Sequence, residues 1–301
     1  MNQAPAGQNP AFDARAAFDR LLGESRARLH RYCARMTGSV IDGEDVVQET
    51  MIKALEAFPS TGTIVNPEGW LFRIAHNAAL DFLRRRARSA ARHSDEDPDM
   101  MIDPAMVVSD RQIAATSLRT FMRLPAAQRS SVILMDVLGY SLEDIGAVTD
   151  ATVPAIKAAL HRGRARLREL ALEDDDAPTP VLGRRESALL AAYVDRFNAR
   201  DVEAVKAMLA DEVKLDLVAR HKIDGRREVS KYFGNYAGLH DWHLMPGLVE
   251  GRPAALVRDP ADPNGAPRYF VLLDWSADGV IRIRDFRYAN YAMEGAEVVL
   301  L

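Results

Sequence analysis

The spacing of hydrophobic residues changes character along the chain. From Phe12 to about Arg92, and again from Arg111 to Leu172, apolar residues recur with the period of an amphipathic helix. After Glu186 a further helical stretch, SALLAAYVDRFNARDVEAVKAMLA, gives way to segments of alternating polarity: EVKLDLV, PAALVR, RYFVLLDW and GVIRIRDFRYA. The pattern therefore predicts an all-α first two thirds and an α+β last third.

Acidic, proline-bearing stretches separate these parts and set the expected domain boundaries. SDEDPDMMID follows the first helical part, and EDDDAPTPVLG follows the second. A length of 301 residues suits two or three domains. We expect a disordered N-terminus over 1–10, helical domains over 11–93 and 118–172, linkers over 94–117 and 173–184, and an α+β domain over 185–301.

The segment from Leu124 to Leu170 has the pattern of a helix-turn-helix with a basic second helix. Ser141 begins Ser-Leu-Glu-Asp, which has the form of a capping box. Thr152 is the expected N-cap of the next helix, whose first turn tolerates Pro154 because early helical N–H groups lack partners. The side chains expected to face inward are Ile156, Leu160 and Leu167. Such a helix is typical of proteins that enter the DNA major groove; the alternative is a solvated basic helix in an ordinary bundle.

Charge is segregated into blocks, although the formal net charge is only −4. Between Trp70 and Arg92 six arginines accompany one acid, Asp81, and the following SDEDPDMMID carries no base. The net charge excludes a simple polycation, so any nucleic-acid contact must be local. The alternative is charge interspersion for solubility.

A single cysteine, Cys33, excludes a disulfide framework and makes a thiolate metal site implausible. It lies in RLHRYCARM, on the expected buried face of a helix. The sequence contains neither a signal-peptide pattern nor an apolar run long enough to span a membrane. We expect a cytoplasmic protein without membrane contact, cofactor or metal.

Two further motifs lie in the first helical part. In DGEDVVQETMIKAL a buried stripe leaves an acidic face opposite, which by itself is also typical of a solvated helix. The stripe consists of Val47, Met51, Leu55 and Phe58. In WLFRIAHNAALDFLRRR aromatic residues lead a helix that ends in arginines, a combination that suits phosphate contact and stacking on unpaired bases.

These motifs, in this order over about residues 12–172, resemble the extracytoplasmic-function (ECF) group of bacterial sigma factors. DGEDVVQETMIKAL resembles region 2.2, which implies contact with core RNA polymerase, at its β′ clamp helices, through Asp45, Gln48 and Glu49. WLFRIAHNAALDFLRRR resembles regions 2.3 and 2.4, which melt and read the −10 promoter element. The DNA contacts that this implies are Trp70, Arg73, Asn77, Arg84 and Arg85.

The helix-turn-helix resembles region 4, which reads the −35 element and implies contact with the polymerase β flap. The DNA contacts that this implies are Thr152, Lys157, His161, Arg162 and Arg164. Ala158 and Ala159 stand where family members often carry contacting side chains, so direct readout is expected to be thinner. The loop PSTGTIVNPEG matches the position of the family's pocket for a flipped base. Its polar groups would be Ser60, Thr61, Thr63 and Asn66.

The last third resembles the SnoaL-like α+β cone shared with nuclear transport factor 2 and polyketide cyclases, a fold with a pocket open at one end. The resemblance rests on the helix pair, IDGRREVSKYF and the strands ending in IRDFRYANY. Alternation places Ile283 and Asp285 on one face, so Asp285 and Tyr288 are possible pocket residues, unless a bulge or the sheet rim exposes Asp285. Asp216 is expected to point outward.

The sequence thus predicts an ECF-type sigma factor, not an enzyme, that directs promoter-specific transcription initiation. Its SnoaL-like domain is expected to contact the sigma domains of the same chain and to regulate them in cis, with a possible small-molecule ligand of unknown identity. One alternative is a DNA-binding protein whose pocket is a small-molecule sensor or an enzyme. Another is a polymerase-binding protein that has lost promoter readout.

Overall fold

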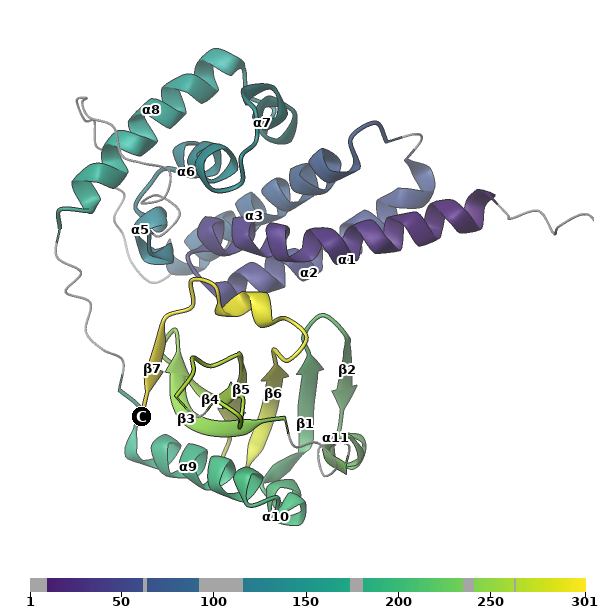
Figure 1. Ribbon diagram of the computed structural model, residues 1–301, viewed down its shortest axis with the longest axis vertical. Helices are drawn as coiled ribbons and strands as arrows, with labels where there is room; N and C mark the ends of the chain where they lie inside the picture. Colours follow the sequence, from purple (N-terminus) through teal and green to yellow (C-terminus); the bar gives the residue numbers. More distant parts are fainter. Residues whose placement is uncertain (1–9, 62–63, 92–115, 174–180, 235–240, 263) are drawn as a thin grey trace, which may run out of the picture. The chain divides into compact units, whose positions relative to one another are not determined.

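The computed structural model describes residues 10–61, 64–91, 116–173, 181–234, 241–262 and 264–301. The chain divides into two compact units, Met1–Glu173 and Asp174–Leu301, called unit 1 and unit 2 below. Unit 1 is helical and unit 2 combines helices with one sheet, which confirms the predicted fold class (Figure 1). Most of the predicted linker residues, 94–115 and 174–180, lie outside the described residues.

The first half of unit 1 is built from long helices. They are α1 (Pro10–Thr37), α2 (Val40–Ala57), the short 3₁₀ helix η1 (Phe58–Ser60) and α3 (Pro67–Ala91). Ser39 caps α2, because its hydroxyl accepts hydrogen bonds from the N–H groups of Ile41 at 3.2 Å and Asp42 at 3.0 Å. Helix α2 therefore begins two residues before the predicted motif.

The second half of unit 1 contains the predicted helix-turn-helix. Its elements are α5 (Leu118–Met122), α6 (Ala126–Val132), the π-helical turn η2 (Ile133–Val137), α7 (Leu142–Thr149) and α8 (Val153–Leu170). The capping box at Ser141 and the N-cap at Thr152 are both confirmed. Between α7 and α8 the chain reverses at Asp150, which adopts a left-handed conformation with φ of 60°.

Both halves of unit 1 share one continuous hydrophobic core. Leu29, Met36 and Leu71 from the first half and Ile133 and Ile145 from the second belong to the same buried cluster. Helix α3 packs against α7, and α1 packs against α5 and α6. The two halves are therefore one folded body in this conformation.

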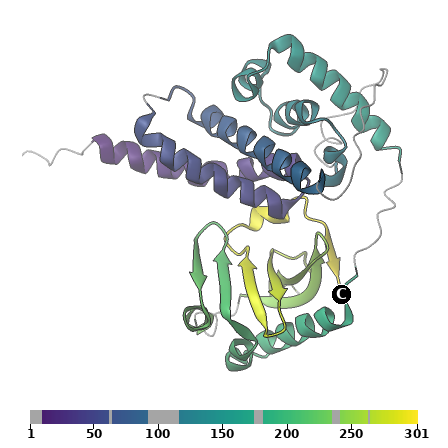
Figure 2. The same cartoon turned by 180° about the vertical axis from the view of Figure 1, so that it is seen from behind.

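Unit 2 is a seven-stranded sheet with helices packed on it. The helices are α9 (Arg184–Asn198), α10 (Val202–Ala207) and α11 (Arg226–Gly234), with a 3₁₀ turn η3 (Asn290–Met293) near the C-terminus. The strands are β1 (Leu209–Leu217), β2 (His221–Asp224), β3 (His243–Val249), β4 (Arg252–Arg258), β5 (Tyr269–Trp275), β6 (Val280–Asp285) and β7 (Val298–Leu300). Their spatial order is β2-β1-β6-β5-β4-β3-β7, and the pair β1 and β6 is parallel (Figure 2).

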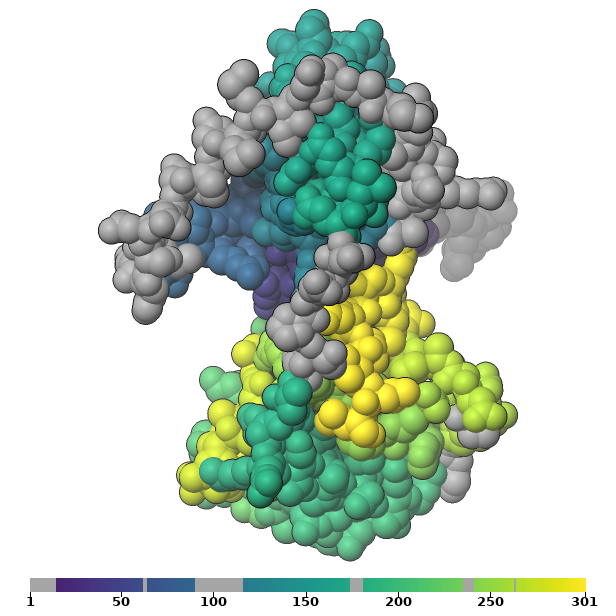
Figure 3. Space-filling model, turned by 90° about the vertical axis from the view of Figure 1, so that its left-hand side faces the viewer, coloured from purple at the N-terminus to yellow at the C-terminus, as the bar shows by residue number. Residues whose placement is uncertain are grey.

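The two faces of the sheet bury different sets of side chains. On one face α9 packs against β3 and β4, and α11 packs against β1. On the other face the rings of Phe270 and Phe286 lie 4.2 Å apart, and η3 packs against β5. The last residues of the chain lie at the surface of this unit, where Leu301 is 56% exposed (Figure 3, yellow).

Four strands were predicted from alternation and are confirmed as β1, β4, β5 and β6. Strand β3 was not predicted, because Pro246 and Gly247 interrupt its pattern and both residues disfavour strands. Strands β2 and β7, at the two edges of the sheet, are too short to show a period.

Two further properties concern the described residues only. None of their helices is long and apolar enough to cross a membrane. No group of His, Cys, Asp or Glu side chains among them is arranged to hold a metal ion. Cys33 is fully buried as predicted, and burial raises the pKa of its thiol.

Candidate functional site

Helix α2 carries the predicted acidic face. Asp45 is exposed, and Gln48 and Glu49 are half-buried one turn further along. Glu49 is held at both carboxylate oxygens, by Lys53 at 2.7 Å and by Arg85 of α3 at 2.8 Å. Burial acts to raise the pKa of Glu49, but the hydrogen bonds from Lys53 and Arg85 outweigh it, so the pKa is lowered. The Glu49 carboxylate is therefore ionised near neutral pH.

Helix α3 presents its basic residues along an exposed side. Arg73 and Asn77 are exposed one turn apart, and Arg84 and Arg85 are exposed two turns further along. Arg84 pairs with Asp81 at 3.0 Å, while Arg85 pairs with Glu49. These surface pairs are weak and salt-sensitive, so the arginines can exchange them for phosphates.

Helix α8 presents its cations beside the turn that begins it. Lys157, His161 and Arg162 are exposed, and the hydroxyl of Thr152 accepts a hydrogen bond from the N–H of Ala155 at 3.4 Å. The predicted inward stripe is confirmed, because Ile156, Leu160 and Leu167 are all buried.

Arg164 differs from the other cations of α8. Its guanidinium forms a two-bonded ion pair with the carboxylate of Asp136 in η2, and Nε lies 2.9 Å from Oδ2. The Asp136 side chain is 1% exposed, so Arg164 neutralises a buried charge. Arg164 therefore fixes α8 on η2, the π-helical turn that continues α6.

The two halves of unit 1 meet around Arg28 of α1. Its guanidinium pairs with Glu68 at the start of α3 and donates a hydrogen bond to the carbonyl of Leu138 at 3.3 Å. The same group lies 5.5 Å from the ring centre of Tyr140 and 5.9 Å from that of Phe72. A polar cavity of about 200 Å³ lies at this junction.

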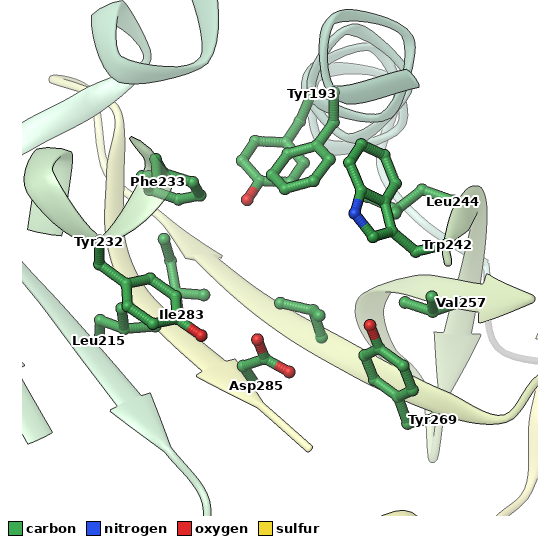
Figure 4. A pocket seen from close by; sticks show the side chains of 12 residues that line it. Tyr193, Leu215, Tyr232, Phe233, Trp242, Leu244, Val257, Tyr269, Ile283 and Asp285 are labelled. Carbon is green, nitrogen blue, oxygen red and sulfur yellow. The ribbon is translucent and has the colours of Figure 1, made fainter. Parts of the chain in front are cut away.

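Unit 2 contains a pocket between its helices and the sheet. The residues that line it are Tyr193, Phe197, Leu215, Tyr232, Phe233, Trp242, Leu244, Val257, Tyr269, Val271, Ile283 and Asp285. Figure 4 shows the Asp285 carboxylate and the hydroxyls of Tyr232 and Tyr269 directed toward its centre. Asp285 is 3% exposed, and its Oδ1 accepts a hydrogen bond from the backbone N–H of Arg287 at 2.8 Å.

Comparisons with known proteins match the helical unit. Models of Sigma-70 region 2 and Sigma-70 region 4 match residues 21–89 and 118–167. The ECF RNA polymerase sigma factor SigE of Mycolicibacterium smegmatis is 33% identical over 162 residues, which cover 52% of this chain and 62% of SigE. The ECF RNA polymerase sigma factor SigM of Mycobacterium tuberculosis is 32% identical over 160 residues, 52% of this chain and 78% of SigM. The chain belongs to the ECF sigma factor family.

Other matches extend to unit 2 of this sigma factor. The ECF RNA polymerase sigma factor SigG of Mycobacterium tuberculosis is 25% identical over 322 residues, which cover 93% of this chain and 84% of SigG. The solved structure of a putative polyketide cyclase from Pseudomonas putida is 18% identical and covers 37% of this chain and 98% of its own, with a TM-score of 0.29.

The alanines of the sigma factor's reading helix need a correction. Ala159 is only 6% exposed and faces the core, so it replaces no DNA-contacting side chain. Ala158 is half-buried, so at most one of the two alanines can stand in place of a DNA-contacting side chain. The sequence did not show which side of α8 faces the core. The close approach of α8 to α6 at Gly163 determines it.

Region 2 of the sigma factor also places two predicted groups in structural roles. Trp70 is half-buried and its ring lies 6.1 Å from that of Phe18, which stacks on Phe58 at 4.0 Å. Asn66 caps α3, because its side-chain oxygen accepts a hydrogen bond from the N–H of Gly69 at 2.9 Å. Neither contact was apparent from the sequence.

The loop before α3 uses its hydroxyls locally. Those of Ser60 and Thr61 donate to the carbonyl of Ala57, at 3.0 Å and 2.8 Å. Thr63 lies outside the described residues, and Val65 is 95% exposed. The polar groups expected around a flipped base are thus partly engaged, at the last carbonyl of α2 and at the N-terminus of α3.

In unit 2 of the sigma factor Asp285 lines the pocket and Tyr288 does not. Tyr288 lies beyond the end of β6, is 44% exposed and stacks under the Arg220 guanidinium at 4.7 Å. Asp216 was expected to point outward; it does lie on the face opposite the pocket, but it is buried and pairs with Arg284 at 3.5 Å. The prediction had treated the face of the sheet opposite the pocket as exposed to solvent, but at Asp216 this face is buried.

Sequence reasoning missed the aromatic residues of the pocket. Tyr193 and Phe197 lie one turn apart on α9, as do many core residues, so their spacing gave no functional signal. Tyr232 and Phe233 come from α11, and Trp242 and Tyr269 from the β-sheet region. Only the folded sheet brings these segments around Asp285.

Proposed function

We propose that this sigma factor binds core RNA polymerase through the acidic face of α2, formed by Asp45, Gln48 and Glu49. Asp45 is exposed, and the half-buried Glu49 carboxylate could exchange its surface pairs with Lys53 and Arg85 for basic groups of the β′ clamp helices. Region 4 would contact the β flap. The proposal includes promoter-specific initiation in the cytoplasm, with promoter DNA as the second partner.

We further propose two DNA-reading surfaces. On α3 the exposed Arg73, Asn77, Arg84 and Arg85 would follow the opened −10 strand, while Trp70 would act after leaving its packed position. On α8 the contacts would be Thr152, Lys157, His161 and Arg162. Arg164 would contribute by holding α8 in place and by adding positive charge at its edge.

The observation that carries the proposal is the partly exposed acidic face of α2 beside an exposed basic face of α3 within a matched region 2. Its test is a pull-down with core polymerase. Replacing Asp45, Gln48 and Glu49 together by alanine should abolish holoenzyme formation, while Glu24→Ala, an exposed acid on α1, should leave it unchanged. Circular dichroism and thermal unfolding check that the variant keeps the helical content and stability of the wild type. Undiminished binding of the triple variant would contradict the proposal.

We propose that unit 2 regulates the sigma regions in cis by biasing how unit 1 opens. Promoter elements centred at −10 and −35 lie about 25 base pairs apart, or about 85 Å along the duplex. A compact body of about 160 residues has a radius of gyration of only about 15 Å. The packed halves of unit 1 must therefore separate to read both elements. A tethered domain can shift that equilibrium through a weak contact with either state, because tethering keeps its effective concentration high.

For the pocket we propose a role in regulation without catalysis. Two of its tyrosines, Tyr193 and Tyr269, keep their protons at neutral pH, because burial and the nearby charge of Asp285 raise their pKa values. Asp285 would then be the one candidate base among the lining residues. The alternative is an enzyme that uses Asp285 for proton transfer, and only an activity would favour it.

A further inference from the structure

We propose that the pocket of unit 2 binds a small organic cation, such as an ammonium ion carrying alkyl groups, with Asp285 as its counter-charge. The proposal goes beyond the sigma function, because it names the chemical class of ligand to which the C-terminal unit responds.

The carboxylate gives the pocket its sign. Among the described residues that line the cavity, Asp285 is the only one with a formal charge, and its carboxylate is directed inward at the end of β6 (Figure 4). A buried carboxylate is costly to keep ionised, and an entering cation gains strong Coulomb attraction where the dielectric is low. The guanidinium of Arg287 lies at the edge, bound to Asp241 at 2.6 Å and to the Tyr269 hydroxyl at 3.2 Å.

Aromatic rings form much of the remaining wall, together with aliphatic side chains of the sheet. Phe197 lies 4.8 Å from Trp242 and 6.0 Å from Phe233, centre to centre, so three rings form a continuous surface. The faces of such rings attract organic cations, and alkylated ammonium ions are recognised by aromatic cages. Trp242 already interacts with a cation, because the guanidinium of Arg200 lies 4.6 Å from its ring centre.

The charge of Asp285 also acts on the tyrosines of the pocket. Burial raises the pKa values of Tyr193 and Tyr269, and the charge of Asp285 raises them further because a second anion there would be repelled. At Tyr269, on the edge of the pocket, the charge and hydrogen bond of Arg287 act in the opposite direction but do not outweigh these effects. The same charge of Asp285 opposes a carboxylate or phosphate ligand. A neutral ligand would gain nothing from it, so the pocket favours a cation.

Tyr232 forms the wall through which a ligand would enter. The cavity volume is about 20 Å³, room for about one water molecule, so an alkylammonium ion requires a side chain to move. Tyr232 is half-buried and also lines an open depression with His221, Asp224, Glu228 and Lys231. Rotation of its ring toward that depression would enlarge the cavity. Glu228 is paired with Lys231 at 2.7 Å, and Asp224 adds a further negative charge at the entrance.

The test compares choline with its neutral isostere, 3,3-dimethylbutan-1-ol, by titration calorimetry on the full chain. We expect choline to bind at least about tenfold more tightly than the alcohol, because the two differ in charge and not in shape. Asp285→Asn should weaken choline binding by at least about tenfold and leave the alcohol unchanged, so that the preference for choline shrinks to what the aromatic rings supply. Asp278→Asn, which removes an exposed acid from the turn before β6, should change neither.

A second variant keeps the test decisive if Asp285→Asn unfolds. Phe233→Leu keeps an apolar wall but removes an aromatic face, so choline should lose severalfold more affinity than the alcohol. Equal binding of choline and the alcohol by the unmodified chain, or no binding of choline by folded protein at millimolar concentrations, would overturn the proposal. Because no polymerase or DNA is present, either result would leave the proposed sigma function untouched.

Discussion

Single buried polar residues join the helices of unit 1 at positions that helical periodicity does not single out. The Tyr32 hydroxyl and His76 Nδ1 form a buried hydrogen bond of 2.7 Å between α1 and α3. Arg129 of α6 donates to the carbonyl of Met36 at 2.5 Å and to that of Leu124 at 2.8 Å. Burial lowers the pKa of Arg129 to about 10, which leaves it charged at neutral pH. Such residues are costly to unpair, so they fix which surfaces of the helices meet.

His76 makes the stability of unit 1 depend on pH. Burial lowers its pKa from 6.5 to about 4, so the unfolded chain binds this proton more readily than the folded chain. The free energy of unfolding should therefore have its full value above pH 6.5. It should fall by about 3 kcal/mol, through this group, as the pH drops from 6.5 toward 4. Chemical denaturation of the wild type and His76→Gln at several pH values measures the difference in slope. His161→Gln, an exposed change on α8, is the control, and equal slopes for His76→Gln and the wild type would contradict the assignment.

At the scale of the element, two helical glycines have opposite roles. A Cβ on Gly163 of α8 would lie 2.8 Å from Val132 Cγ2, in the buried contact with α6, whereas nothing lies within 4 Å of a Cβ on Gly23 of α1. We expect Gly163→Ala to destabilise the fold by roughly 1–3 kcal/mol through overpacking. Gly23→Ala should stabilise it by about 0.5–1 kcal/mol through helix propensity alone. Thermal unfolding of the two variants measures these changes in stability. Equal changes in melting temperature would contradict the packing of α8 on α6.

The cations of α8 should separate into DNA-contacting and structural groups. Lys157→Ala and Arg162→Ala should weaken promoter DNA binding and each reduce the salt slope by about one if they contact phosphate. Arg164→Ala should instead lower stability by roughly 2–3 kcal/mol, because it leaves the buried Asp136 unpaired and Arg164 itself is partly exposed. Fluorescence anisotropy at several salt concentrations checks the first result, with Lys231→Ala in unit 2 as control. Salt slopes identical to wild type in both DNA-contact variants would refute the division.

The sequence predicted elements well where the signal was local. Ser141 and Thr152 were identified as caps because capping depends on residues within one turn. The buried state of Asp285 followed from alternation along one strand. Contacts between distant segments were not predictable: Arg164 with Asp136, Trp70 with Phe18, and the aromatic walls of the pocket all depend on how elements pack.

At the scale of the whole molecule, removal of unit 2 should change transcription by the sigma regions. Truncation after Leu182 keeps all of unit 1, which ends at Glu173. We expect promoter activity at equal concentrations to change severalfold, in either direction, because the tethered unit biases how unit 1 opens. A full chain carrying a protease site within 174–180 is the matched control, since cleavage breaks the tether and removes no domain. Equal transcription by intact, cleaved and truncated protein would show that unit 2 is inert.

The central claim is that this chain gives core RNA polymerase its promoter specificity. The most direct measurement is transcription in vitro from a genomic promoter library, mapped at the RNA 5′ ends, with core polymerase alone and with the chain added. The account predicts a defined set of start sites that appears only with the chain. Those sites should share upstream elements near −10 and −35 and disappear when Asp45, Gln48 and Glu49 are replaced by alanine. A start-site profile identical to that of core polymerase alone, with folded protein and active core, would contradict it.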